Sequence, residues 1–358
     1  MLEERRKILT RTIPFILAGF FILILYLYFV GFSKITEAFA RVNPNIFSIA
    51  ILATVFEVLL FTFTWHYLLK ALSVKVKFFR ALSYVLVGVF IDILIPAESV
   101  SAEISKIYLM NKDGKDVGKV TATLVIQRIY GMIIHVASLA FACLCLFIVN
   151  YSLPSLVVYL VWITIGLTFV FLALIFVFCS KQELTKRLLS KILGFVKRII
   201  PKRFNLQTWE GIIEKGLDTF YSSFSSLLKS PKKLLISIFS AVSSWIFCLL
   251  VSQLVFYSLG YNNISFIIVV IVYSLSIIVQ YIPAGIPAEV GVTEIVMSSL
   301  YATFGVPLGV SAVATILIRF LTVWLKFILG FVALQWVGIK TITKGQVVET
   351  DKTSFKQL

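Results

Sequence analysis

Charged side chains stand within or beside long apolar segments of this chain, where a charge is costly to place. Six are carboxylic acids, namely Glu57, Asp92, Glu98, Glu103, Glu289 and Glu294. Two are arginines in the middle of apolar runs, Arg128 in LVIQRIYG and Arg319 in TILIRFLT. A central arginine costs about 2.5–3.5 kcal/mol on insertion scales, so such residues usually face the protein interior, form pairs and mark a functional pathway.

Two of the acids and both arginines share one spacing. Arg128 follows Glu103 by 25 residues, and Arg319 follows Glu294 by 25 residues. We therefore expect each glutamate to lie beside its arginine. A planar guanidinium binds phosphate or carboxylate through two hydrogen bonds, so an anionic headgroup can take the place of the glutamate. The alternative is that both are permanent buried ion pairs, which only fix the packing of helices.

Further polar residues join these pairs in a candidate binding region for an anionic substrate. Lys106 either binds the substrate or extends toward lipid headgroups, and the same two roles are open to Lys326, seven residues after Arg319 on the same helix face. The candidate substrate-binding residues are Arg128, Arg319, Glu103, Glu294, Glu98, Glu289, Lys106 and Gln127, with Ser99, Ser101, Thr121 and Thr123 along the first site.

The remaining ionisable residues of the apolar segments have simpler explanations. Glu57 and Asp92 are interpreted as interior, hydrogen-bonded carboxyl groups rather than proton carriers. His66 and His135 have no partner at metal-ligand spacing, so we interpret both as helix-interface residues. We accordingly predict no catalytic residue, no metal site and no cofactor.

Helix-breaking residues accompany the acids. These are Pro96, Pro283, Gly285, Pro287 and Gly291. Proline interrupts a helix because it lacks an N–H and clashes with the preceding turn, and glycine adds backbone freedom. Broken backbone at membrane depth is tolerated only inside protein or against a wet cavity, and it exposes helix N-termini that favour anions. The breaks therefore mark the expected binding region.

An internal repeat links the two sets of residues. The segment IPAESVSAE begins at Ile95 and IPAEVGVTE begins at Ile286, an offset of 191 residues. Over 34 ungapped positions, from Ile95 to Arg128, ten residues are identical in the two segments. Coincidence between two proline-containing breaks is the alternative. We place the first repeat at about 46–149 and the second at about 234–338. Paired, interrupted segments of this kind are typical of transporter binding sites.

The composition shows which elements position these residues. The chain has 358 residues, of which 59% are hydrophobic and 14% are charged, against about 45–50% and 25% in soluble domains. About 20 apolar residues span a bilayer as a helix. We predict one all-α polytopic membrane domain over residues 1–358, with two short broken or re-entrant segments at 96–111 and 283–300. The eight predicted spans are 13–32, 46–69, 78–95, 120–149, 154–179, 234–260, 264–282 and 306–338.

The basic residues predict the topology. The net charge is +16, and residues 181–233 hold twelve Lys or Arg against four acids. We interpret 180–233 as a basic amphipathic cytoplasmic loop on an anionic leaflet, rather than a nucleic-acid site. If both short segments change side, every basic loop and both termini lie in the cytoplasm and the repeats are inverted. Parallel repeats remain the alternative, because a sixteen-residue helix reaches only about 24 Å.

These motifs resemble the transmembrane region of lysylphosphatidylglycerol synthases, which also occurs alone as flippase-like membrane proteins of bacteria and archaea. The resemblance covers about residues 13–338. The residues that carry it are Pro96, Ser101-Ala102-Glu103, Lys106 and Gln127-Arg128 in the first half, and Pro283, Gly285, Gly291, Glu294, Gly305, Pro307 and Arg319 in the second. The chain departs from the family pattern where Ser-Ala replaces Gly-Gly, Lys106 replaces Arg and Gln127 replaces Glu.

The resemblance implies lipid translocation. We expect a transporter that flips an anionic phospholipid or a polyprenyl-phosphate-linked sugar, in the cell membrane. The soluble aminoacyl-transfer domain of bifunctional members has no counterpart here, so we expect no aminoacyl transfer, and no Walker motif indicates ATP drive. Two alternatives remain: a membrane enzyme acting on lipid-linked sugars, with Glu98 and Glu103 or Asp113 and Asp116 as its acids, and an accessory subunit. Expected partners are the lipid, a lipid-modifying protein or a second copy of the chain.

Overall fold

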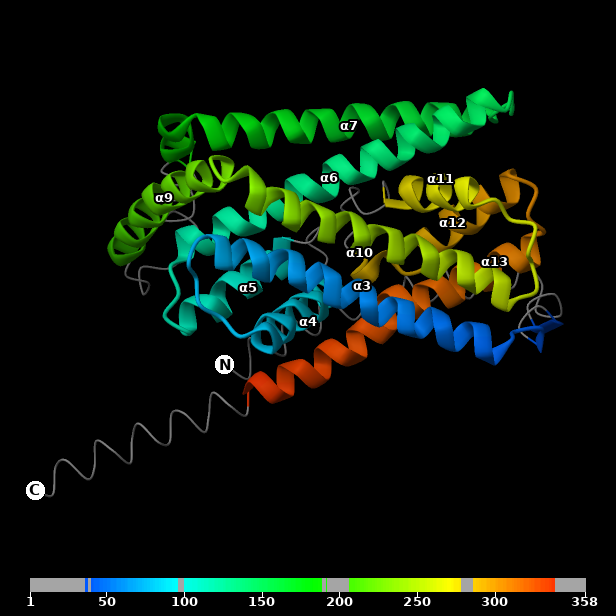
Figure 1. Cartoon of the computed structure of the whole chain (residues 1–358), viewed down its shortest axis with the longest axis horizontal. Coiled ribbons are helices and arrows are strands. Elements are labelled where there is room, and N and C mark those ends of the chain that lie inside the picture. Colours follow the sequence, from blue (N-terminus) through cyan, green and yellow to red (C-terminus); the bar gives the residue numbers. More distant parts are fainter. Residues whose placement is uncertain are drawn as a thin grey trace, which may run out of the picture.

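A computed structural model provides the structure of the chain (Figure 1). It describes residues 36–37, 40–95, 100–188, 191, 206–277 and 286–338, with backbone alone for 206–214. Within this part of the chain the protein is helical and has no strand. The predicted all-α class is therefore confirmed.

The described helices follow one another along the chain. They are α3 (Pro44–Ala71), α4 (Phe78–Leu94), α5 (Val100–Lys112), α6 (Val117–Ile148), α7 (Ser155–Ser180), α9 (Leu206–Leu228), α10 (Pro231–Ser258), α11 (Phe266–Ser276), the 3₁₀ turn η2 (Pro287–Glu289), α12 (Val292–Thr303), α13 (Leu308–Arg319) and the π-helical segment η3 (Phe320–Trp324). After η3 the last helix continues to Gly338.

Five helices of the described residues are long and apolar enough to cross a membrane: α3, α6, α7, α10 and the continuous helix Leu308–Gly338. All five coincide with predicted spans, and the protein is a multi-pass membrane protein. The predicted spans 78–95 and 264–282 correspond to the shorter helices α4 and α11. The predicted span 13–32 lies outside the described residues.

Helices α3 and α10 pack along one another in opposite directions. The Asn43 amide at the start of α3 donates to the carbonyl of Ser258 at the end of α10, at 2.6 Å. Near the middle of both helices the Ser244 hydroxyl donates to the Glu57 carbonyl at 3.1 Å. At the far end the Lys233 ammonium donates to the Ala71 carbonyl. These contacts run in antiparallel order from one end of the pair to the other.

The helices of the two predicted repeats have the same order and similar lengths. Adding 191 to the bounds of α5 gives 291–303, and α12 covers Val292–Thr303. Adding 191 to the bounds of α6 gives 308–339, and the last helix covers Leu308–Gly338. Figure 1 shows α6 running from left to right and the last helix from right to left. Together with the antiparallel α3 and α10, this is the arrangement that inverted repeats produce.

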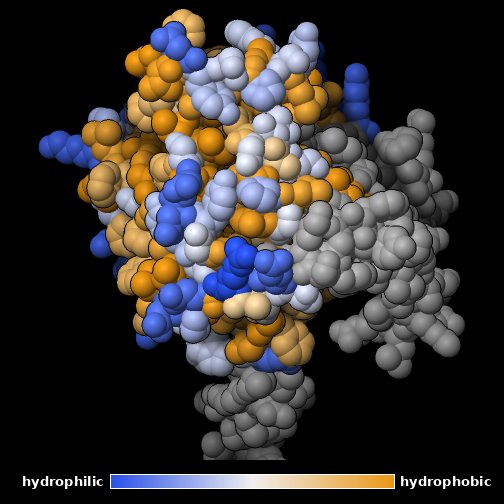
Figure 2. Space-filling model, turned by 90° about the vertical axis from the view of Figure 1, so that its right-hand side faces the viewer, coloured by the Kyte–Doolittle hydropathy of each residue, from blue (hydrophilic) through white to orange (hydrophobic). Residues whose placement is uncertain are grey.

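The two ends of the bundle differ in charge. One end joins α3 to α4, α5 to α6 and α9 to α10, and it carries most of the basic residues that the structure describes. These include Lys70, Lys75, Lys77, Arg80, Lys112, Lys115, Lys215, Lys229, Lys232 and Lys233. At the other end Tyr151 stacks on Phe304, and the connections 149–154, 259–265 and 304–307 contain no charged residue. Figure 2 views this second end, where hydrophilic residues lie among hydrophobic ones.

Helix α9 is held closely against the start of α6. A Cβ atom added to Gly118 would lie 2.4 Å from the carbonyl oxygen of Gly216, so only glycine allows this approach. Phe220 and Phe224 of α9 pack against the buried cluster around Trp65. The described apolar face of this predicted amphipathic helix therefore contacts the rest of the protein.

Large apolar side chains cover the outer surface of the bundle. Phe147, Phe239, Phe176 and Phe79 each expose more than 70% of their surface. In a bilayer this apolar surface contacts lipid tails. The lipid therefore takes the place that a larger core would have in a soluble protein.

Candidate functional site

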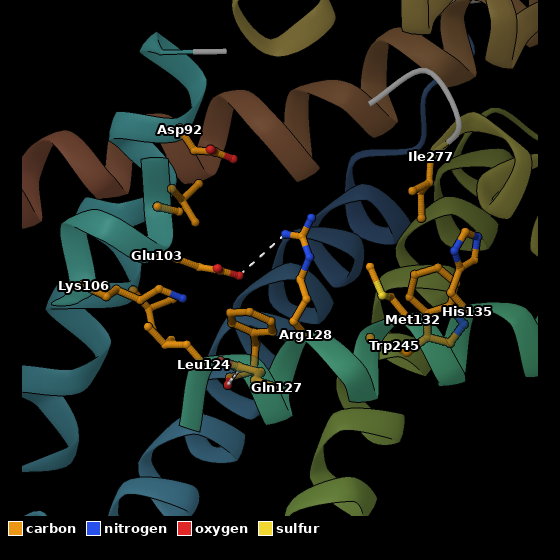
Figure 3. Close-up of a pocket in the computed structure, with 15 residues that line it drawn as sticks. Asp92, Glu103, Lys106, Leu124, Gln127, Arg128, Met132, His135, Trp245 and Ile277 are labelled. Atoms are coloured by element: carbon orange, nitrogen blue, oxygen red, sulfur yellow. Dashed lines mark hydrogen bonds and ion pairs between the residues drawn. The ribbon is translucent and has the colours of Figure 1, made fainter. Parts of the chain in front are cut away.

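A cavity of about 380 Å³ lies among α3, α4, α5, α6 and α10 (Figure 3). Its size is within the range of ligand pockets. Apolar and aromatic side chains make most of its wall, with Phe61 and Trp245 among them. Its polar lining residues are Asp92, Glu103, Lys106, Gln127, Arg128 and His135. Four predicted substrate-binding residues thus line one cavity.

The predicted partners Glu103 and Arg128 face each other across this cavity. The Arg128 Nη1 atom lies 3.6 Å from the Glu103 Oε1 atom, which is long for a charge-assisted hydrogen bond. The two side chains expose 29% and 30% of their surface, respectively. Glu103 comes from the first turn of α5 and Arg128 from the middle of α6. This pair is a loose contact that a ligand can reach from the cavity.

Lys106 is the most deeply buried cation of the cavity. Only 6% of the residue is exposed, and its ammonium lies over the rings of Trp65, at 5.5 Å, and Phe61, at 5.9 Å. It makes no hydrogen bond or ion pair within the described part of the chain. Of its two predicted roles, extension toward lipid headgroups does not fit this position. Figure 3 shows Lys106, Glu103 and Arg128 directed toward the same space.

Hydrogen bonds hold the neighbouring polar groups in place. The Ser101 hydroxyl donates to Asp92 Oδ1 at 2.5 Å, and the Gln127 amide donates to the carbonyl of Phe61 at 3.1 Å. The Trp65 indole N–H donates to the hydroxyl of Thr123 at 3.1 Å, which fixes the ring beneath Lys106. These contacts join α4 to α5 and α3 to α6 around the cavity.

The second predicted pair has a different setting. Arg319 Nε donates to Glu294 Oε1 at 3.0 Å, and the two side chains expose only 8% and 4% of their surface. Glu294 Oε2 also accepts the amide of Gly291 at 2.6 Å, and Arg319 donates to the carbonyl of Ala288. Each charged group thus has two partners. The adjoining space, lined by Arg319, Thr293 and Thr322 among others, is about 20 Å³, room for about one water molecule.

The second helix break supplies the backbone groups of this pair. Ala288, Glu289 and Gly291 have φ values of +54°, +47° and +88°, and Pro287 begins the turn. Residues other than glycine adopt positive φ at a cost of about 1–3 kcal/mol, so surrounding contacts must hold this turn. The turn directs a carbonyl to Arg319 and an amide to Glu294. The break predicted at Pro287 and Gly291 therefore shapes the second pair directly.

Several predicted site residues lie outside the described residues. They are Glu98, Ser99, Pro96, Pro283 and Gly285. Glu289 is described and lies half-buried in the turn. Ser101 and Thr123 contact cavity residues, while the Thr121 hydroxyl donates to the Val117 carbonyl of its own helix.

A third ion pair was missed by reasoning from the sequence. Lys326 Nζ lies 2.6 Å from Glu57 Oε2, and the side chains expose 14% and 12% of their surface. The position equivalent to Lys326 in the first repeat, 191 residues earlier, is His135. Its Nε2 donates to the carbonyl of Ser274 at 2.9 Å. Because Glu57 and Lys326 are 269 residues apart, no local spacing indicated their contact; only their mid-helix positions gave a signal.

The acids considered for an enzyme have other partners. Asp113 accepts hydrogen bonds from Arg80 and from the hydroxyl of Tyr84. Asp116 caps α6 by accepting the amide of Lys119 at 2.9 Å. Within the described residues, no group of three or more His, Cys, Asp or Glu side chains is placed to hold a metal ion.

Comparison with known proteins agrees with these motifs. Residues 16–330 match the family described as the lysylphosphatidylglycerol synthase TM region. The chain belongs to this family. The match covers both glutamate–arginine pairs, the cavity and the turn at Pro287.

Archaeal membrane proteins are similar to the family member described here. The UPF0104 membrane protein of Pyrococcus horikoshii is 26% identical over 324 residues, which are 88% of this chain and 94% of that protein. The UPF0104 membrane protein of Methanocaldococcus jannaschii is 26% identical over 332 residues, 92% of this chain and 95% of that protein. No solved structure matches the chain.

Proposed function

We propose that this protein is a flippase-like transporter that moves an anionic lipid headgroup across the bilayer. The single observation that carries the proposal is Lys106, a residue only 6% exposed, whose ammonium is directed into a cavity and has no ion-pair partner among the described residues. A buried, unpaired charge is expensive, and proteins usually keep one only where it has a function. An anion entering this cavity would supply the missing partner.

The headgroup phosphate binds between Lys106 and Arg128. The guanidinium of Arg128 can bind two phosphate oxygens, while Lys106 contributes a compact positive charge. Glu103, only loosely held at 3.6 Å, gives up its place beside Arg128. The lipid tails stay in the apolar phase while the headgroup passes inward. Phospholipids and polyprenyl-phosphate-linked sugars share this phosphate chemistry.

The two sites serve opposite halves of the membrane. We assign the basic end of the bundle to the cytoplasm of the cell membrane because positive residues favour that side. Helix α5 then carries the first site in the cytoplasmic half, and α12 carries the second in the outer half, both as re-entrant elements. The open first site would receive the headgroup from the cytoplasmic leaflet. The name of the family refers to the synthesis of a phospholipid, and this supports a lipid substrate.

Reconstituted vesicles test the proposal. Purified protein is reconstituted into phosphatidylcholine liposomes that contain a trace of one fluorescent lipid: phosphatidylglycerol, phosphatidylcholine or a farnesyl-phosphate-linked hexose. A quencher added outside removes the fluorescence of probe in the outer leaflet, so the rate of quenching reports movement between leaflets. We expect an anionic probe to move, and Lys106→Met or Arg128→Ala to slow it by about tenfold or more, equal to about 1.4 kcal/mol. Lys112→Met, an exposed position on the same helix, is the matched control. Equal rates in wild type and both variants would overturn the proposal.

A further inference from the structure

The charged residues that line the cavity determine whether another ion must bind together with the headgroup. Lys106 and Arg128 contribute two positive charges, and Asp92 and Glu103 contribute two negative charges. His135 is the other titratable group of the described lining. With His135 neutral, the described lining of the empty cavity therefore has no net charge. A phosphodiester adds one negative charge to a site of low dielectric constant, where an unbalanced charge is costly.

The geometry shows which group loses its partner when the headgroup binds. The charged groups that act on Glu103 are Arg128, Lys106 and Asp92. The phosphate engages both cations, so Glu103 is left facing a phosphate and a second carboxylate. Asp92, in contrast, accepts a hydrogen bond from the hydroxyl of Ser101. Glu103 is thus the carboxylate whose negative charge becomes unfavourable.

We propose that Glu103 takes up a proton as the anionic headgroup binds, so that the transporter moves the lipid together with a proton. The proposal rests on the proposed function. The proton comes from the aqueous phase and binds a carboxylate oxygen of Glu103, which restores the charge balance of the occupied cavity. Release of the headgroup returns Glu103 to Arg128 and the proton to water. A transmembrane pH gradient would thereby drive net lipid movement.

The second pair shows why the first is suited to this role. Glu294 is held by Arg319 and the amide of Gly291, and only 4% of its side chain is exposed. Among the described residues, Glu103 makes one ion-pair contact, the long one with Arg128, and 30% of its side chain is exposed. A carboxylate exchanges protons with water only where water reaches it. In this structure a cavity of about 380 Å³ leaves room for water beside Glu103, whereas Glu294 is almost fully enclosed.

Proton uptake on binding is the direct test. Purified protein in a weakly buffered detergent solution at neutral pH is titrated with dioctanoyl phosphatidylglycerol, with binding followed by calorimetry and proton uptake by an indicator dye. We expect about one proton per bound lipid for the wild type, and affinity that falls about tenfold per pH unit as pH rises. Glu103→Gln, which stays neutral, should bind without proton uptake and without this pH dependence.

Two matched variants identify the group. Asp92→Asn and His135→Gln should each keep the proton uptake per bound lipid. Binding of wild type without proton uptake would overturn the inference and leave the proposed function standing. Uptake that survives in Glu103→Gln, or that is lost in Asp92→Asn or His135→Gln instead, would also overturn it. Absence of lipid binding in the wild type would overturn the proposed function itself.

Discussion

The two glutamate–arginine pairs have the same residue types at the same spacing, yet their surroundings are opposite. Arg128 and Glu103 lie 3.6 Å apart in a cavity of about 380 Å³. Arg319 and Glu294 lie 3.0 Å apart beside a space of about 20 Å³. One charge pattern thus gives an open site in the first repeat and a closed one in the second. The surrounding contacts, rather than the pair itself, decide which form it takes.

Two features of the second repeat account for its closure. The turn at Ala288 supplies a carbonyl to Arg319, and Gly291 supplies an amide to Glu294. Met297, only 2% exposed, stands at the position equivalent to Lys106, so no unpaired cation draws in a ligand. Each feature can be changed separately, which gives the following predictions.

Removing an arginine should cost far more stability in the second pair than in the first. Arg319→Ala leaves Glu294 as a buried charge with one amide partner and leaves the Ala288 carbonyl unpaired. Breaking a buried pair in this way costs about 3–5 kcal/mol. Arg128→Ala leaves Glu103 in a cavity that water reaches, so we expect about 1 kcal/mol or less. Thermal unfolding in detergent measures both, and equal losses would show that the two pairs are equally buried.

The buried ion pair between Glu57 and Lys326 should also stabilise the protein. Lys326→Met removes the ion-pair partner of Glu57 near the middle of the bundle. We expect the free energy of unfolding to fall by about 3 kcal/mol, the lower end of the range for breaking a buried ion pair. The exchange Glu57→Lys with Lys326→Glu should recover part of that loss, because the two charges remain in contact. A double-mutant cycle on unfolding midpoints gives the coupling energy. A coupling energy near zero would mean that this 2.6 Å contact does not stabilise the protein.

Much of the fold was predictable because its determinants are local or periodic. The long apolar runs gave the spans, as with α3 at Pro44–Ala71 against a prediction of 46–69. The shared 25-residue spacing gave the pairing of Arg128 with Glu103 and of Arg319 with Glu294. The identical spacing in both repeats, however, contained no signal for which pair is open.

The unpredicted features arise from contacts between distant segments. The ion pair of Glu57 with Lys326 joins the first helix of one repeat to the last helix of the other. The cavity wall at Trp245 comes from α10, far in sequence from Glu103 on α5. The burial of Lys106 depends on the rings of Phe61 and Trp65 on α3. Such contacts follow from the packing of whole helices, which spacing within a segment does not reveal.

Exchanging the residues at positions 106 and 297 should have opposite consequences in the two repeats. Lys106→Met removes a buried ammonium that has no ion-pair partner among the described residues, so we expect the unfolding free energy to rise by about 1–2 kcal/mol while lipid movement slows by about tenfold or more. Met297→Lys buries a cation in a closed site and should lower stability instead. Denaturation midpoints together with the vesicle assay measure both effects. A loss of stability in Lys106→Met would show that the lysine serves packing rather than binding.

The last prediction concerns the backbone turn that holds the second glutamate–arginine pair. Gly291 has a φ of +88° and a ψ of −47°, which a residue with a Cβ adopts at a cost of about 1–3 kcal/mol. Gly291→Ala should therefore lower the free energy of unfolding by that amount, and it should weaken the hydrogen bond from the amide of residue 291 to Glu294. Gly166→Ala is the control, since Gly166 lies within α7 with open space around it, and alanine there should raise stability by about 0.5–1 kcal/mol. Hydrogen exchange at the start of α12 reports the local change. If both variants shift the midpoint in the same direction, the positive φ at Gly291 is not what holds the second pair closed.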